Sequence, residues 1–409
     1  MNVLFLSPGF PTEMTDFVRG LSEVGATVIG LGDQADHALP EKARQALAAY
    51  YQVDFADPEA VISIAVAIAE RIQVDRVESL WEPLMILAAR IREALGVRGM
   101  SEVETVPYRD KEAMKQLLDV AGVRTPHHYG ARTAREVWTA LEHVGYPAII
   151  KPIAGAGSTD TYRVNEPDQV ERIISALGHI DEVSVEEFIE GEEFTFDTIC
   201  AGGKVLFYNI CWYRPRPLIG KQNEWISQQT VVLRDPDVDH LRVGRQLGLR
   251  VLEAMRFRDG FTHMEWYLKP DGEAVFGEIG ARPPGGRTVD AMNFASDIDL
   301  FTGWAEAVVS GKFSQPLERR YNVAVVFKRA IGSGRIQRHE GLDRLLAEYG
   351  THVAAIELNP FGAPRRNWRQ QLVGDGMVVV RHPDLQTCIE IADRFGTDFQ
   401  IFAEERGER

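Results

Sequence analysis

Two apolar segments joined by a tight turn constrain the fold of this chain more than any other feature. Residues 260–268 and 275–280 each carry one carboxylate among apolar neighbours, Glu265 and Glu278, and Lys269-Pro-Asp-Gly272 joins the segments. Pro and Gly stand where a connection between antiparallel strands needs them, so the pattern predicts a hairpin. Adjacent carboxylates repel each other unless cations lie between them, and Mg²⁺ prefers such oxygen ligands. We therefore predict a magnesium site, the alternative being a surface hairpin with two solvated acids.

Length and composition set the broad class of the protein. The 409 residues predict two or three domains, and 45% hydrophobic and 26% charged residues are typical of a soluble globular protein. No apolar run is long enough to span a membrane, and the first residues resemble a strand rather than a signal peptide. Cys200, Cys211 and Cys388 share no metal-ligand spacing, which fits a reducing cytoplasm. The net charge of −15 argues against nucleic acid or an anionic membrane as partner, and a homodimer is possible.

The pattern along the chain predicts four parts. Residues 1–108 alternate apolar strands with helical segments, which indicates a parallel α/β domain with its ligand at the carboxyl ends of the strands. The expected strands are 3–6, 27–31 and 76–80, the expected helices are 15–24, 58–71 and 84–95, and the candidate ligand loops are 8–11 and 81–83. Residues 109–190 form a small mixed α/β lobe, residues 191–316 a larger lobe with the hairpin, and residues 317–409 a C-terminal lobe.

A lysine followed by a flexible loop suggests a phosphate site. Lys151 ends an apolar strand, and Gly155, Gly157, Ser158 and Thr159 follow it. Small residues let main-chain amides approach a polyanion, and the hydroxyl groups can also donate hydrogen bonds. A lysine that merely reaches solvent is the alternative.

An acidic segment suggests a nucleoside site. An adenine needs an apolar slot beside main-chain donors and acceptors, and a ribose needs a carboxylate. Residues 186–189 can supply the adenine slot and Glu193 the ribose acid. A solvated acidic hairpin is the other interpretation.

The order of these features resembles the ATP-grasp superfamily over essentially the whole chain: Arg109-Asp-Lys111, the Lys151 loop, the acidic segment 185–194, Glu265, and Glu278 with Arg282 four residues later. The resemblance implies an ATP-grasp fold of α/β and α+β type, with an N-terminal parallel domain, a small lobe, a large lobe and an appended C-terminal lobe. It implies ATP and Mg²⁺ as cofactors, two ions with Mn²⁺ as a possible substitute. The implied phosphate-binding lysines are Lys111 and Lys151, the adenine segment contains Glu186, Glu187 and Ile189, the ribose acid is Glu193, the metal ligands are Glu265 and Glu278, and Arg282 steadies the transferred phosphoryl group.

One departure from the family pattern bears on its branches. Many relatives have Asn two residues after the second metal-ligating Glu, where this chain has Gly280. The spacing from Glu278 to Arg282, followed by Pro283-Pro-Gly-Gly286, is similar to the L-amino acid ligase branch. That similarity implies an ATP-dependent ligase that joins a small-molecule carboxylate and an amine, with amino acids as the expected substrates, through an acylphosphate.

Substrate contacts are expected around the metal hairpin. His263 either orients a substrate carboxylate, acts as a base, or is structural. Gly285, Gly286 and Arg287 are candidates for binding an amino-acid carboxylate, Glu82 in loop 81–83 is a further candidate, and the aromatic and cationic segment 212–230 either covers the substrate or forms an interface.

Two other functions remain open. One is a biotin-carboxylase-like enzyme that phosphorylates bicarbonate, although the longer glycine run and the Asn-x-Arg arrangement of that branch are absent here. The other is a non-catalytic nucleotide-binding regulator, which would have no need of an intact carboxylate pair and arginine.

Overall fold

The N-terminal domain is built on a parallel sheet. This computed structural model describes residues 1–153, 160–368 and 374–405. The strands β1 (Asn2–Leu6), β2 (Thr27–Gly32), β3 (Ala49–Gln52) and β4 (Arg76–Glu78) lie parallel in the order β3-β2-β1-β4. Val3 and Phe5 face one hydrophobic core while Leu4 and Leu6 face another, as expected of a strand that is covered on both faces. The predicted parallel sheet is confirmed, and β3 is an additional strand.

Helices cover both faces of this sheet. The domain contains α1 (Met14–Glu23), α2 (Glu41–Ala46), α3 (Pro58–Ala69), α4 (Met85–Leu95) and α5 (Glu102–Thr105). The three predicted helices correspond to α1, α3 and α4, and α3 packs against α4. Helix α1 packs against α12 (Leu300–Ser310), which joins this domain to the large lobe.

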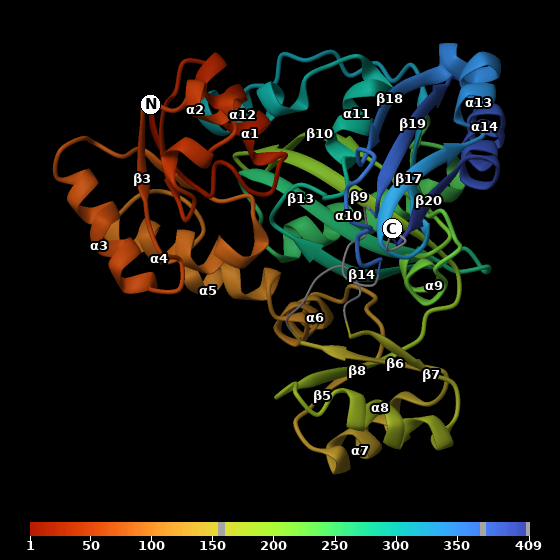
Figure 1. The fold of residues 1–409 in the computed structure, drawn as a ribbon. Helices are drawn as coiled ribbons and strands as arrows, with labels where there is room; N and C mark the ends of the chain where they lie inside the picture. The colour runs from red at the N-terminus through yellow and green to blue at the C-terminus, as the bar shows by residue number, and fades with distance from the viewer. Residues whose placement is uncertain (154–159, 369–373, 406–409) are drawn as a thin grey trace.

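The small lobe is an antiparallel sheet with two helices on one side (Figure 1). Its strands β5 (His128–Ala131), β6 (Ala148–Pro152), β7 (Tyr162–Val164) and β8 (Val183–Glu187) follow the order β5-β8-β6-β7. The helices are α7 (Ala134–Val144) and α8 (Val170–Ala176), and α6 (Lys111–Val120) lies between this lobe and the large sheet. A separate hydrophobic core holds the lobe together.

A nine-stranded sheet forms the body of the large lobe. Its order is β14-β13-β9-β11-β12-β15-β19-β18, with β10 paired to β9. The bounds are β9 (Glu192–Ala201), β10 (Lys204–Asn209), β11 (Cys211–Arg214), β12 (Gln229–Val232), β13 (Gly260–Leu268), β14 (Ala274–Gly280), β15 (Asn322–Lys328), β18 (Val353–Leu358) and β19 (Gly376–His382). The strands β15, β18 and β19 belong to the same sheet as β9 to β14. The expected boundary at residue 316 therefore separates strands of one sheet.

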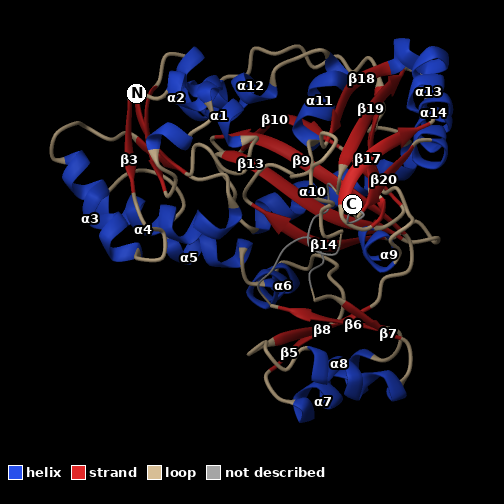
Figure 2. Ribbon diagram, viewed as in Figure 1, coloured by secondary structure: helices blue, strands red, loops and turns tan. Residues whose placement is uncertain are grey.

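Helices cover the large sheet as well (Figure 2). Helix α10 (Asp239–Ala254) contacts β13 and β14, α11 (Thr288–Ser296) contacts β12, β15 and β19, and α12 contacts β9 and β13. The remaining elements are α9 (Pro217–Gln222), α13 (Leu342–Tyr349), α14 (Leu385–Asp398), and the small sheet of β16 (Ile331–Gly332), β17 (Arg335–Glu340) and β20 (Gln400–Glu404). No helix in the described ranges has the length and apolar character that crossing a bilayer requires.

Candidate active site

The hairpin forms as predicted and brings its two carboxylates together. Strands β13 and β14 pair antiparallel with Glu265 opposite Glu278 and His263 opposite Gly280. The register shifts directly after Glu265. Tyr213 on β11 donates a hydrogen bond to Glu265 across 3.4 Å. Each carboxylate side chain keeps about a quarter of its surface exposed (25% and 27%), so its oxygens can reach a ligand.

The two carboxylates fit a magnesium site that is shared with a nucleotide. The described residues contain no cluster of three or more histidine, cysteine or acidic side chains that could hold a metal ion by themselves. Mg²⁺ often takes one or two protein carboxylates and completes its shell with phosphate oxygens and water. Glu265 and Glu278 supply that number of ligands. At Gly280, where many ATP-grasp proteins have Asn, an added Cβ would lie 3.2 Å from Cγ of Arg282, which is a tight contact.

Lysines from the small lobe face this carboxylate pair. Lys111 Nζ lies 3.3 Å from Glu278 Oε2. Burial alone would raise the pKa of Glu278, but Lys111, Lys151 and Arg282 hold it well below its usual range. The carboxylate is therefore charged, which is the state that binds a cation.

Lys151 belongs to a buried ion network that the sequence did not reveal. Glu186 Oε2 lies 2.8 Å from Lys151 Nζ, and Glu186 also forms an ion pair with the fully buried Lys115. Burial lowers the pKa of Lys115, whereas the carboxylate of Glu186 outweighs burial and raises the pKa of Lys151. Glu186 thus orients Lys151. Lys115 follows Lys111 by four residues on α6, and this helical spacing was the one available clue.

The predicted phosphate loop cannot be placed. Gly155, Gly157, Ser158 and Thr159 lie outside the described residues. The strand that leads into the loop, β6, ends at Pro152 beside Lys151.

The acidic segment has two different faces. Glu187 lines the cavity beside the metal hairpin, and its side chain forms hydrogen bonds with Arg124 at 3.0 and 3.1 Å. Glu193 is buried at the start of β9, and Arg216 donates to it across 3.1 Å. Burial and the nearby charge of Glu265 raise the pKa of Glu193, against the attraction of Arg216. Ile189 is also buried and lines the same cavity as Lys151, Glu265 and Glu278.

Arg282 is held by the N-terminal domain. Its Nε donates to Glu82 Oε2 across 2.7 Å, and its Nη1 donates to the main-chain oxygen of Pro283. Glu82 also forms an ion pair with Arg109, two residues before Lys111. Glu82 therefore ties the N-terminal domain to both the lysine helix and the metal hairpin. Phe10 and Trp81, from the two loops expected at the strand ends, pack edge to face at 5.1 Å.

His263 is held between two carboxylates. Its Nδ1 lies 2.6 Å from Asp197 Oδ1, and its Nε2 lies 3.7 Å from Glu265 Oε1. Burial would lower the pKa of His263, but the buried Asp197 outweighs it and raises the pKa to about 9. A protonated imidazole cannot accept a proton, so this geometry suits a residue that orients Glu265 better than a base.

The segment after the hairpin forms a turn that opens α11. Gly286 and Arg287 both have positive φ, and Thr288 donates to the main-chain oxygen of Gly285. The guanidinium of Arg287 lies 2.9 Å from Glu357 on β18 and 3.6 Å from Asp290. Arg287 thus connects the turn to the C-terminal part of the sheet.

A second polar network that the sequence did not reveal lies beside α6, the helix that carries Lys111 and Lys115. His128 on β5 contacts Glu112 at 2.7 Å and Asp119 at 3.0 Å, and Glu112 also accepts a hydrogen bond from Ser184. Burial would lower the pKa of His128, but the two carboxylates outweigh it and raise the pKa above 6.5.

We expect this network to stabilise the protein most at low pH. The contribution of His128 is complete below its ordinary pKa of about 6.5 and is lost as the pH rises through the higher folded-state pKa. The free energy of unfolding of the native protein should exceed that of His128→Asn most at pH 5.5, with the difference shrinking toward pH 8.5 in urea titrations. His240→Asn, at an exposed helix position, is the control. A difference that grows with pH would contradict the assignment.

Comparison with known proteins agrees with this architecture. Residues 22–98 match the ATP-grasp N-terminal domain and residues 108–214 match the ATP-grasp domain. The crystal structure of an L-amino acid ligase from Bacillus licheniformis superposes with a TM-score of 0.80 and 18% identity over 99% of each chain. An N5-carboxyaminoimidazole ribonucleotide synthetase from Thermotoga maritima gives 0.72, with 17% identity over 98% of this chain and 99% of that chain.

Sequence relatives cover parts of the chain. The L-arginine-specific L-amino acid ligase of Bacillus subtilis is 28% identical over 244 residues, which is 58% of this chain and 58% of that protein. A D-alanine–D-alanine ligase from Clostridium beijerinckii is 29% identical over 26% of this chain and 36% of its own length. The predicted ATP-grasp fold is thereby confirmed: two ATP-grasp domain models match neighbouring parts of the chain, and the shared architecture extends over 99% of it.

Proposed function

We propose that the protein is an ATP-dependent carboxylate–amine ligase that releases ADP and phosphate. One observation carries the proposal: Lys111 of the small lobe meets Glu278 of the metal hairpin, and Arg282 lies four residues beyond that carboxylate. Lys111, Glu265 and Glu278 line one cavity, and Arg282 is among the charges that lower the pKa of Glu278. We assign these residues the phosphate-binding, metal-binding and oxyanion-stabilising roles. Phosphoryl transfer relies on these groups, because its catalysis is mainly positioning and charge stabilisation.

Each residue has a defined task in this scheme. Glu265 and Glu278 hold Mg²⁺, for which we propose two ions with Mn²⁺ as a possible substitute, and the metal offsets charge on the phosphate oxygens. Lys111 and Lys151 bind phosphates together with Gly155, Gly157, Ser158 and Thr159. Glu186 orients Lys151, while the main chain from Glu187 to Ile189 binds adenine and Glu193 binds the ribose. His263 positions Glu265.

The reaction balances in two steps. A carboxylate oxygen of the first substrate forms a bond to the γ-phosphorus as the bond between that phosphorus and the β,γ-bridging oxygen breaks, so that ADP leaves and an acylphosphate results. The amine nitrogen of the second substrate then bonds to the acyl carbon, the bond from that carbon to the phosphate oxygen breaks, and the amine proton passes to the released phosphate. Arg282 stabilises negative charge on the transferring phosphoryl group and on the tetrahedral intermediate.

The substrates we propose are amino acids, joined as an amide or dipeptide. The relative from Bacillus subtilis is described as an L-amino acid ligase, and the turn from Gly285 to Arg287 offers main-chain amides beside the metal hairpin. Glu82 is the candidate substrate-binding residue from the N-terminal domain. A cytoplasmic location and a homodimer stay predictions from the sequence.

An ADP-release assay tests the proposed function. The protein is incubated with ATP, Mg²⁺ and pooled amino acids, and mass spectrometry identifies the product. We expect turnover that requires amino acids and yields an amide. Turnover that depends on bicarbonate alone would support a carboxylase-type enzyme instead, and nucleotide binding without turnover would support a regulatory protein.

A further inference from the structure

Arg216 lies inside the cavity that contains the metal carboxylates. It follows β11 and directly precedes α9, and it lines this cavity together with Lys151, Glu193 and Glu278. Its guanidinium carbon lies 5.0 Å from the ring centre of Phe188 and 4.6 Å from that of Tyr267. Only 16% of the side chain is exposed. Arg216 is therefore a planar cation held between aromatic rings rather than a solvated surface charge.

The hydrogen bonds of Arg216 coincide with positions that a nucleoside would use. Its Nη1 donates to the main-chain oxygen of Ile189 across 2.7 Å, and its Nε donates to Glu193 across 3.1 Å. Ile189 belongs to the proposed adenine segment and Glu193 is the proposed ribose acid. A guanidinium and an adenosine group both present a flat face and outward N–H or O–H donors. The main-chain oxygen of Ile189 and the carboxylate of Glu193 cannot bind the guanidinium and an adenosine group completely at the same time.

The cavity is also too small to hold a nucleotide in its present form. Its volume is about 130 Å³, whereas pockets that bury a ligand of moderate size usually have about 300–1,000 Å³. A nucleotide therefore requires some wall of this cavity to move. The segment from Tyr213 to Leu218 supplies one wall, and Arg216 is its charged member.

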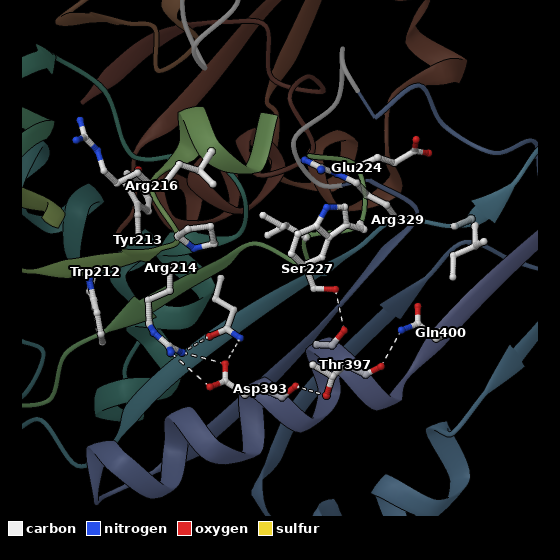
Figure 3. Close-up of a pocket in the computed structure, with 18 of the residues that line it drawn as sticks. Trp212, Tyr213, Arg214, Arg216, Glu224, Ser227, Arg329, Asp393, Thr397 and Gln400 are labelled. Carbon is white, nitrogen blue, oxygen red and sulfur yellow. Dashed lines mark hydrogen bonds and ion pairs between the residues drawn. The ribbon is translucent and has the colours of Figure 1, made fainter. Parts of the chain in front are cut away.

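Space for such a movement exists on the other side of the segment. A second pocket of about 1400 Å³ lies between the segment and α14, and Tyr213 and Arg216 line both pockets. Arg214 points toward Asp393 on α14, at 3.1 Å, whereas Arg216 points away from it (Figure 3). The segment from Tyr213 to Leu218 thus separates the two pockets. Arg214 anchors it to α14 on one side, and Arg216 closes the nucleoside site on the other.

We infer that Arg216 is a gate residue of the nucleoside subsite, whose guanidinium leaves Ile189 and Glu193 before an adenosine group occupies these acceptors. The inference rests on the proposed function, because it assumes that ATP enters this cleft. Closed and open states then compete, and the apparent nucleotide affinity equals the affinity of the open state multiplied by the fraction of molecules that are open. The gate acts on the nucleoside part of the ligand and leaves the phosphate part alone.

Calorimetry with two probes tests the gate. MgADP carries the nucleoside, and magnesium tripolyphosphate carries only the phosphates. Arg216→Met keeps an aliphatic stem between the rings but removes the donors. Arg245→Met, which also removes an arginine that stacks on a tyrosine ring but lies on α10 outside this cavity, is the matched control. If the closed state holds about nine tenths of the molecules, Arg216→Met should bind MgADP about tenfold more tightly. Tripolyphosphate affinity should stay unchanged, as should both affinities in Arg245→Met.

Each other outcome has a defined meaning. Unchanged or weaker MgADP binding in Arg216→Met would overturn the gate, and a parallel loss of tripolyphosphate binding would make Arg216 a phosphate ligand instead. Arg216→Lys, which keeps a charge beside Glu193 but cannot reach both acceptors equally, should tighten MgADP binding by a smaller factor and replaces the Met variant if that one fails to fold. A native protein that binds neither probe would overturn the proposed function along with the gate, whereas native binding combined with weaker binding in the variant overturns the gate alone.

Discussion

Glu278→Ala should abolish magnesium-dependent ADP release while the protein stays folded. Glu278 lies opposite Glu265 in the register of β13 and β14, so its removal leaves a single carboxylate at the metal site. Metal ions contribute several kcal/mol of charge stabilisation in such reactions, and about 1.4 kcal/mol corresponds to a tenfold change in rate. We therefore expect turnover to fall by at least about two orders of magnitude.

The hairpin offers a matched control for this variant. Glu273 directly precedes β14, and its exposed side chain forms an ion pair with Lys269. Glu273→Ala should keep its ADP release, measured with a coupled enzyme assay across a magnesium titration. Circular dichroism and thermal unfolding verify the fold of both proteins. Full activity of Glu278→Ala at low magnesium would mean that this carboxylate is not a metal ligand.

Arg282→Ala should lower kcat/KM. The expected loss of transition-state stabilisation is about 3 kcal/mol, which is the scale for the loss of one oxyanion donor. Its Nε is held by Glu82, and this contact fixes the direction of the guanidinium. Glu82 keeps Arg109 as a partner in the variant, so the buried carboxylate is not left without a cation. The fold should therefore survive the substitution.

The affinity for nucleotide separates two roles of Arg282. A residue that acts mainly in the transition state leaves the dissociation constant of MgADP almost unchanged while turnover falls. Steady-state kinetics together with calorimetry provide both values, and Arg245→Ala, which removes a surface ion pair with Asp237, is the control. An equal loss of MgADP affinity would show that Arg282 binds the ground state.

Local features of the sequence predicted the hairpin well. Its apolar segments, turn residues and two carboxylates lie within about twenty positions, so strand geometry predicts that the carboxylates lie on adjacent strands. The parallel N-terminal sheet was predictable for the same reason, since alternating strands and helices determine its layers. The register shift that places Glu265 opposite Glu278 was not predictable from the pattern.

Contacts between distant side chains were not predictable in this way. Lys115 meets Glu186 across 71 positions and Arg216 meets Glu193 across 23. Neither spacing has a period, and a lysine or arginine is usually a surface residue. The assignment of residues 317–409 to a separate lobe had the same weakness, because strand order within a sheet does not follow from the pattern of any one strand. The sequence pattern could locate β15 but could not reveal that it pairs with β12.

That pairing has a practical consequence for anyone who wishes to shorten the protein. All four residues of β12 are buried, and β15 supplies the hydrogen bonds along one of its sides. Ending the polypeptide before β15 would leave this strand with a bare, apolar margin of unsatisfied amide groups, which invites self-association. The part of the chain from β15 onward is therefore better regarded as a structural component of the large lobe than as a detachable accessory.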